Sequence, residues 1–106
     1  MGDTLDTLRE LFDELADRAG AEKADLAGTC EYLRDGRAFA AIDGDAAEVR
    51  LDPEIAEAVL RTPSTGGSSR GVAWVRFAPS ELDQHARDRA EAWFLSAWRA
   101  AQSGEH

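Results

Sequence analysis

The amino-acid sequence predicts an α+β domain with a four-stranded, mainly antiparallel sheet, a three-stranded meander plus one strand, packed by an N-terminal and a C-terminal helix. Apolar residues at helical spacing mark both ends of the chain. Two Asp-Gly pairs interrupt strand-like runs within residues 31–51, and residues 72–77 are rich in β-formers. The expected order is α-β-β-β-α-β-α. Because 106 residues is close to the commonest domain size, we expect a single domain over residues 1–106.

The first helix is predicted from its caps and its apolar stripe. Asp3 or Thr4 can cap its start, and Gly20 ends it. The stripe consists of Leu5, Leu8, Phe12, Leu15 and Ala16. Residues 21–28 then read as a connection.

Asp35-Gly36 and Asp43-Gly44 predict the meander, because tight type I′ hairpin turns favour Asp-Gly. The strands are expected at residues 29–34, 37–42 and 46–51. Two-residue turns would set Tyr32 opposite Phe39 and Arg37 opposite Arg50. The expected core face carries Leu33, Ala38, Ala40, Ile42, Ala47, Val49 and Leu51, and the exposed face carries Cys30, Tyr32, Phe39, Ala41, Ala46 and Glu48.

The second half of the chain predicts a short helix, a loop, a strand and a long helix. Asp52-Pro53 begins the short helix and Thr62-Pro63 ends it. Residues 64–71 (STGGSSRG) read as a flexible surface loop. After the strand at 72–77, Ser80 or Asp83 caps the last helix. Its apolar face is Leu82, Ala86, Ala90, Trp93, Phe94, Ala97, Trp98 and Ala101.

Arginines suggest the candidate site. The predicted register gathers Arg34, Arg37 and Arg50 in a row at one end of the exposed sheet face, and Trp74 and Arg76 extend it onto the fourth strand. Like charges across neighbouring strands repel, so a bound anion could relieve the row. The alternative is that these arginines are solvated or paired with surface carboxylates, which is common on protein surfaces.

Composition restricts the classes of function. A net charge of −9 disfavours nucleic acid as a partner. The single cysteine, Cys30, allows no intrachain disulfide, which fits a reducing, cytoplasmic compartment, and reads as a small core residue. His85 has no histidine or cysteine nearby at metal spacing, so we expect neither a metal nor a cofactor. The N-terminus lacks the apolar run of a signal peptide or membrane span.

Several short motifs resemble the MmcQ/YjbR-like family, and more distantly the TfoX N-terminal domains. Gly36, Phe39 and Ala40 match the family's G-K-x-F-A strand, with Arg37 in place of lysine. Further matches are Val49 to Leu51, Trp74 with Val75, and Ala97 to Arg99, where Trp98 replaces a tyrosine. The likeness covers roughly residues 5–101. It implies a compact α+β fold with helices packed on a sheet, a suggestion of DNA binding for some members, and no catalytic residues to transfer.

The predicted function is a non-enzymatic binding or interaction domain. It would recognise a small anionic ligand or a protein partner on the exposed sheet face. One alternative is a DNA-binding module of the MmcQ/YjbR type. The other is a small enzyme that uses a carboxylate or His85 as acid or base. A homodimer through exposed Tyr32 and Phe39 is a further possibility.

Overall fold

The computed structural model describes residues 7–26 and 28–102, which form three helices and six strands. The helices are α1 (Leu8–Ala19), α2 (Pro53–Val59) and α3 (Gln84–Gln102). The strands are β1 (Glu22–Leu26), β2 (Thr29–Arg34), β3 (Arg37–Asp43), β4 (Ala46–Arg50), β5 (Thr65–Ser68) and β6 (Gly71–Phe77). No helix within these ranges is long and apolar enough to cross a membrane.

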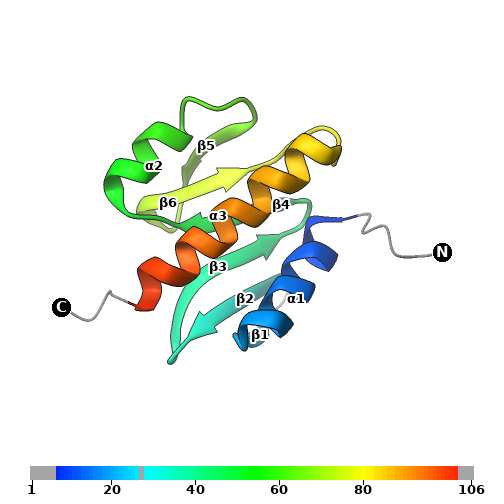
Figure 1. Ribbon diagram of the computed structural model, residues 1–106, viewed down its shortest axis with the longest axis vertical. Coiled ribbons are helices and arrows are strands. Elements are labelled where there is room, and N and C mark those ends of the chain that lie inside the picture. The colour runs from blue at the N-terminus through cyan, green and yellow to red at the C-terminus, as the bar shows by residue number, and fades with distance from the viewer. Residues whose placement is uncertain (1–6, 27, 103–106) are drawn as a thin grey trace.

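All six strands form one antiparallel sheet in the order β1-β2-β3-β4-β6-β5. Helices α1 and α3 lie across one face of this sheet, and α2 lies beside β5 and β6 (Figure 1). The α+β class was therefore predicted correctly. The four-stranded sheet and the order α-β-β-β-α-β-α were wrong, because the order is α-β-β-β-β-α-β-β-α.

The two unpredicted strands are the two edges of the sheet. Strand β1 (EKADL) lies where a connection was expected, and β5 (TGGS) lies in the expected loop at 64–71. Neither has the alternation of apolar and polar residues that marks a half-buried strand. Each is held by backbone pairing to a single neighbour, β2 or β6. An edge strand of this kind leaves almost no signal in its side chains.

The first hairpin contains a β-bulge that reverses part of the predicted face assignment. The turn at Asp35-Gly36 forms as expected, with φ of 54° and 82°, and Arg34 opposes Arg37. However, Tyr32 opposes Ala40, so Phe39 is an extra residue in β3. The bulge places Ala40 and Ile42 on the same face as Tyr32, and this face lies beneath the helices, where Tyr32 and Phe39 are fully buried. The prediction that both lie on the exposed face was wrong, as was the homodimer patch built on them.

The second hairpin turns one residue later than predicted. Asp43 opposes Ala46, so the turn residues are Gly44 and Asp45, and only Gly44 has a positive φ, of 62°. This is the glycine-first arrangement of a type II′ turn. The pairing shifts by two residues, which keeps Val49 on the core face but prevents Arg37 from opposing Arg50.

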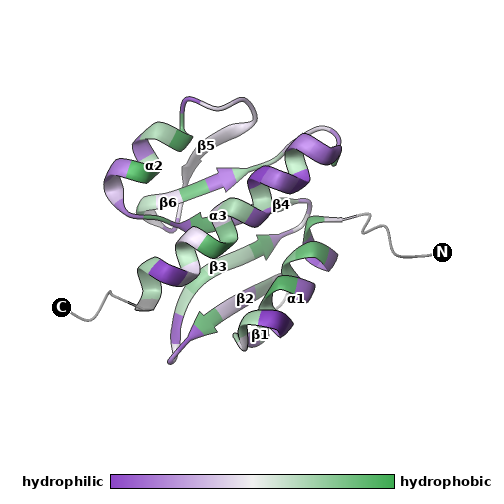
Figure 2. Cartoon of the chain, viewed as in Figure 1, coloured by the Kyte–Doolittle hydropathy of each residue, from purple (hydrophilic) through white to green (hydrophobic). Residues whose placement is uncertain are grey.

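Phe94 of α3 lies at the centre of the core. Its ring packs edge-to-face on Phe12 of α1, Tyr32 of β2 and Phe39 of β3, with centroids 4.8, 5.9 and 5.2 Å away. Hydrophobic segments of the sheet lie beneath the two helices, whose outer surfaces are more hydrophilic (Figure 2). The expected packing of the last helix over the sheet is confirmed, since Trp98 also contacts Phe39.

Helix caps follow the predicted chemistry at shifted positions. Thr7 caps α1 by accepting a hydrogen bond from the Glu10 N–H, whereas Asp3 and Thr4 lie outside the described residues. Gly20 ends α1 in the left-handed conformation, as predicted. Asp83 caps α3, because its carboxylate accepts from the Ala86 N–H at 2.9 Å.

The Tyr32 hydroxyl is the main polar group that the core encloses beneath α1. It donates a 2.7 Å hydrogen bond to the carboxylate of Asp13. Burial raises the pKa of Tyr32 above its ordinary value, and the hydrogen bond to Asp13 raises it further. The neutral phenol is thus favoured in the folded state.

This pKa shift predicts a delayed alkaline titration. Because the folded pKa lies above the unfolded value of 10.0, Tyr32 contributes stability that is complete below pH 10 and is lost as the pH rises beyond it. Tyr32 is the only tyrosine, so tyrosinate absorbance near 295 nm reports on it alone. We expect no rise through pH 10–11 until unfolding begins, with the protein in denaturant titrating near pH 10 as the control. A rise centred at pH 10 with intact circular dichroism would contradict the enclosed phenol.

Candidate functional site

The five predicted site residues do not form one row. Arg34 lies on the helix side of the sheet, where its Nη1 donates to the Trp98 carbonyl at 3.0 Å. Its guanidinium also stacks on the Trp98 ring, 3.9 Å from the centroid. Arg34 therefore fastens the C-terminal part of α3 to β2 and is already engaged.

Arg76 and Trp74 lie on the opposite side of the sheet. On that side, paired residues form one row across the neighbouring strands β2, β3, β4 and β6. The row consists of Glu31, Ala41, Glu48 and Arg76. We call this side the helix-free face. The Arg76 Nη1 contacts Asp43 at 3.1 Å and Glu48 at 3.2 Å. The hydrogen bond to Asp43 and the contact with Glu48 raise the pKa of Arg76 despite the opposing effect of burial.

Arg70, which was assigned to the flexible loop, organises the helix-free face. Its Nε donates to Glu48 and its Nη1 to Glu31, both at 2.8 Å. Its guanidinium lies 5.3 Å from the centroid of the Trp74 ring, and the Ser68 hydroxyl donates to Glu48 at 2.8 Å. Burial lowers the pKa of Arg70, but the hydrogen bonds that it donates to Glu31 and Glu48 outweigh this effect and raise the pKa.

These residues form a charge network that is nearly neutral. Glu48 is 4% exposed, so its carboxylate requires the partners it receives. The ion pairs join three carboxylates to two guanidinium groups, which leaves this set one negative charge in excess. The network consists of Glu31, Asp43, Glu48, Arg70 and Arg76. The helix-free face is consequently not the positive anion-binding surface that the sequence predicted. One sequence signal was available, because Glu48 stands at the centre of β4 between the apolar residues Ala47 and Val49.

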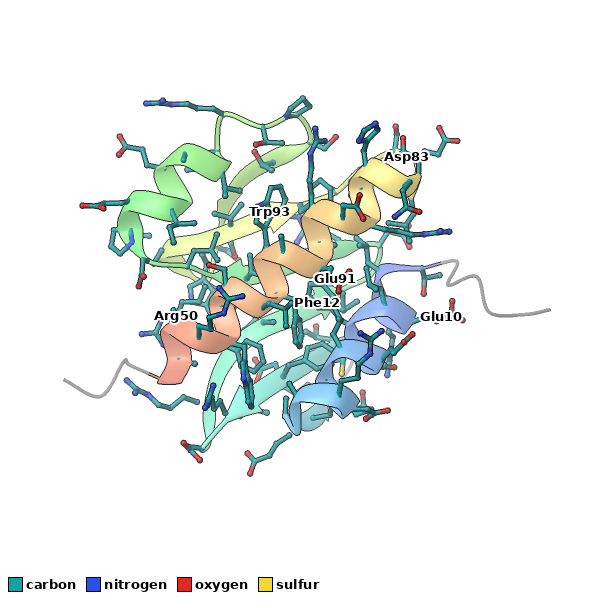
Figure 3. The ribbon with its side chains drawn as sticks, in the orientation of Figure 1. Glu10, Phe12, Arg50, Asp83, Glu91 and Trp93 are labelled. Carbon is teal, nitrogen blue, oxygen red and sulfur yellow. The ribbon has the colours of Figure 1, made fainter. Side chains whose placement is uncertain are left out.

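Arg50 belongs to a different feature, a pocket of about 250 Å³ that we call the α2–α3 pocket. Figure 3 places Arg50 beside the C-terminal part of α3. Apart from Arg50 and Asp52, its lining residues are apolar: Phe39, Leu51, Pro53, Ala73, Ala97, Ala100 and Ala101. Among the described residues, neither Arg50 nor Asp52 forms an ion pair. Arg37 is exposed at the β2–β3 hairpin and does not line this pocket.

His85 lies in a second pocket, of about 270 Å³, together with Glu81 and Asp83. Asp83 is engaged in capping α3. His85 is exposed, and no hydrogen bond within the described ranges orients its ring, as a general base would require. The same ranges contain no group of three or more His, Cys, Asp or Glu side chains that could hold a metal ion. Cys30 is buried, and burial raises its pKa, which makes the thiol a poor nucleophile.

No protein-family model, curated protein or solved structure matches this chain. The resemblance to the MmcQ/YjbR-like family therefore stays a prediction.

The charge network predicts that Arg70 contributes to stability. Arg70→Gln should lower the free energy of unfolding in urea by about 1–3 kcal/mol, because it removes two charge-assisted hydrogen bonds from nearly buried glutamates. Adding Glu48→Gln to Arg70→Gln should recover part of the lost free energy of unfolding, because the double variant no longer buries a carboxylate that has lost one of its hydrogen-bond donors. Arg18→Gln is the matched control, because its pair with Glu14 is exposed, and its urea midpoint should stay close to that of the wild type. An Arg70 variant as stable as this control would show that the network is not stabilising.

Proposed function

We propose that this protein is a non-enzymatic binding domain that takes a small carboxylate with a short apolar body into the α2–α3 pocket. The observation that carries the proposal is Arg50, a partly buried arginine without an ion-pair partner among the described residues, which lines a pocket whose other residues, apart from Asp52, are apolar. A partly desolvated arginine binds a carboxylate more strongly than an exposed one does.

The other predicted arginines fit this role less well. Arg34 is bound to Trp98, and Arg76 is bound to Asp43 and Glu48. Arg37 is exposed at its hairpin and does not line the pocket. Arg50 thus combines an unengaged charge with a concave apolar wall, which is the usual composition of a small-molecule site.

Asp52 indicates that the ligand also carries a positive charge. It lies on the same pocket wall, so a ligand with an ammonium group beside its carboxylate would satisfy both charges. A volume of about 250 Å³ lies below the range of about 300–1,000 Å³ that is typical of drug-sized ligands. An apolar α-amino acid has the matching size and charge pattern.

The pocket chemistry favours binding over catalysis. Among the described residues, its lining has no serine, cysteine, histidine or lysine, and Asp52 is the only carboxylate there. The alternative acid–base site at His85 lacks an orienting partner, as described above. The DNA-binding alternative is disfavoured by the net charge of −9 and by carboxylates that neutralise Arg70 and Arg76. A protein partner on the helix-free face would have to compete with the charge network.

Isothermal titration calorimetry with three probes of one carbon skeleton tests the proposal. L-Leucine carries both charges, 4-methylpentanoate only the carboxylate, and isoamylamine only the amine. We expect the affinity to fall in that order. Arg50→Gln should weaken leucine binding about 10- to 100-fold, because it removes a charge-assisted hydrogen bond of about 1.5–3 kcal/mol.

Two matched variants control for non-specific charge effects. Arg37→Gln removes the same charge from outside the pocket and should leave the affinity for leucine unchanged. Asp52→Asn should weaken leucine binding but not 4-methylpentanoate binding. No detectable binding of any probe at millimolar concentration, or equal losses in Arg37→Gln and Arg50→Gln, would overturn the proposal.

A further inference from the structure

The two edges of the sheet are protected to different degrees. Edge strand β1 carries charges on three of its five residues, Glu22, Lys23 and Asp25. Edge strand β5 has the sequence Thr65-Gly66-Gly67-Ser68 and carries none. Natural sheets commonly place charged residues on exposed edges because unpaired backbone groups otherwise recruit another strand. The β5 edge lacks this protection.

The pairing of β5 with β6 shows which of its backbone groups point outward. The Ala78 N–H donates to the Ser64 carbonyl at 2.9 Å, so Ser64 and Ala78 are a hydrogen-bonded pair. Bonded and non-bonded pairs alternate along an antiparallel ladder. Gly66 therefore bonds to Arg76 of β6, whereas Thr65 and Gly67 direct their N–H and C=O groups to the outer edge.

We propose that β5 pairs antiparallel with β5 of a second copy of this chain, about a two-fold axis that passes through Gly66. In this register Thr65 of each copy opposes Gly67 of the other, and every outward backbone group of these residues finds a partner. Each of the two symmetric pairs exchanges two hydrogen bonds. If the register shifted by two residues in either direction, at most one hydrogen-bonded pair would remain, and it would lie on the axis. The other outward-facing residue of each β5 would then oppose a residue outside β5.

The surroundings of β5 favour a second copy over an unrelated extended peptide. A two-fold axis normal to the sheet brings the two α2 helices antiparallel on the same side, because α2 lies beside β5 and β6 (Figure 1). The segment of α2 and the turn after it carries opposite charges four residues apart, at Glu57 and Arg61, which is a self-complementary pattern for two antiparallel copies. Within the described residues both are exposed and without ion-pair partners. The exposed apolar side chains of Ile55 and Leu60, at 39% and 42%, belong to the same region.

Cysteine cross-linking tests the register. Gly66 of the two copies would form a non-hydrogen-bonded pair with Cα atoms about 4.5 Å apart, within the range of a disulfide. Gly67 of the two copies would lie roughly 8 Å apart, beyond that range. Neither glycine has atoms within 4 Å of an added Cβ, so both substitutions fit the monomer. Gly66→Cys should form a disulfide-linked dimer on mild oxidation, whereas Gly67→Cys should not; buried Cys30 is present in both.

Light scattering coupled to size-exclusion chromatography tests the association itself. The wild type should show a concentration-dependent rise toward the dimer mass, and Gly67→Lys should abolish it by placing a charge on the β5 edge. Leu26→Lys places the same charge at the other edge, where Leu26 is 54% exposed, and should leave the dimer intact. A wild type that stays monomeric at high concentration, a dimer equally sensitive to both lysines, or equal cross-linking of both cysteine variants would overturn the proposal.

Discussion

The extra residue in β3 opposite Tyr32 is the constraint on which the rest of the structure depends. A regular hairpin would pair Tyr32 with Phe39 on one face of the sheet and place Ala40 and Ile42 on the other face. The bulge instead places Ala40 and Ile42 on the same face as Tyr32, and on this face the rings of Tyr32 and Phe39 meet Phe94 of α3. The three elements are thereby joined by edge-to-face aromatic contacts, and Phe39 also becomes part of the wall of the α2–α3 pocket.

The same bulge determines what remains on the helix-free face. With the large rings withdrawn, the centre of this face is the small Ala41, flanked by Glu31 and Glu48. A buried carboxylate at Glu48 requires cationic partners. Arg70 reaches over Ala41 from the β5–β6 turn to supply one, and Arg76 supplies another. The polar network is therefore a consequence of removing bulky side chains from this side of the sheet.

Sequence reasoning succeeded where side chains carry the signal and failed where the backbone does. The α+β class, the first Asp-Gly turn, Gly20 as helix stop and the apolar face of α3 all follow from periodicity and turn chemistry. Strands β1 and β5 are edge strands in which apolar and polar residues do not alternate, and the bulge at Phe39 is a backbone irregularity. The side-chain pattern of the sequence therefore predicted none of these three features. The second turn lies one residue later than predicted, and the resulting two-residue shift in pairing separated Arg37 from Arg50. The predicted arginine row failed through register, not through residue chemistry.

The distribution of charge now distinguishes structural arginines from those available for binding. Arg34, Arg70 and Arg76 each have defined acceptors in the fold, so their presence requires no ligand. Arg50 is partly buried, lines a pocket whose other residues apart from Asp52 are apolar, and forms no ion pair among the described residues. In a chain of net charge −9, carboxylates are abundant and such an arginine could readily be paired. We therefore propose that the partner of Arg50 is a carboxylate from outside the chain.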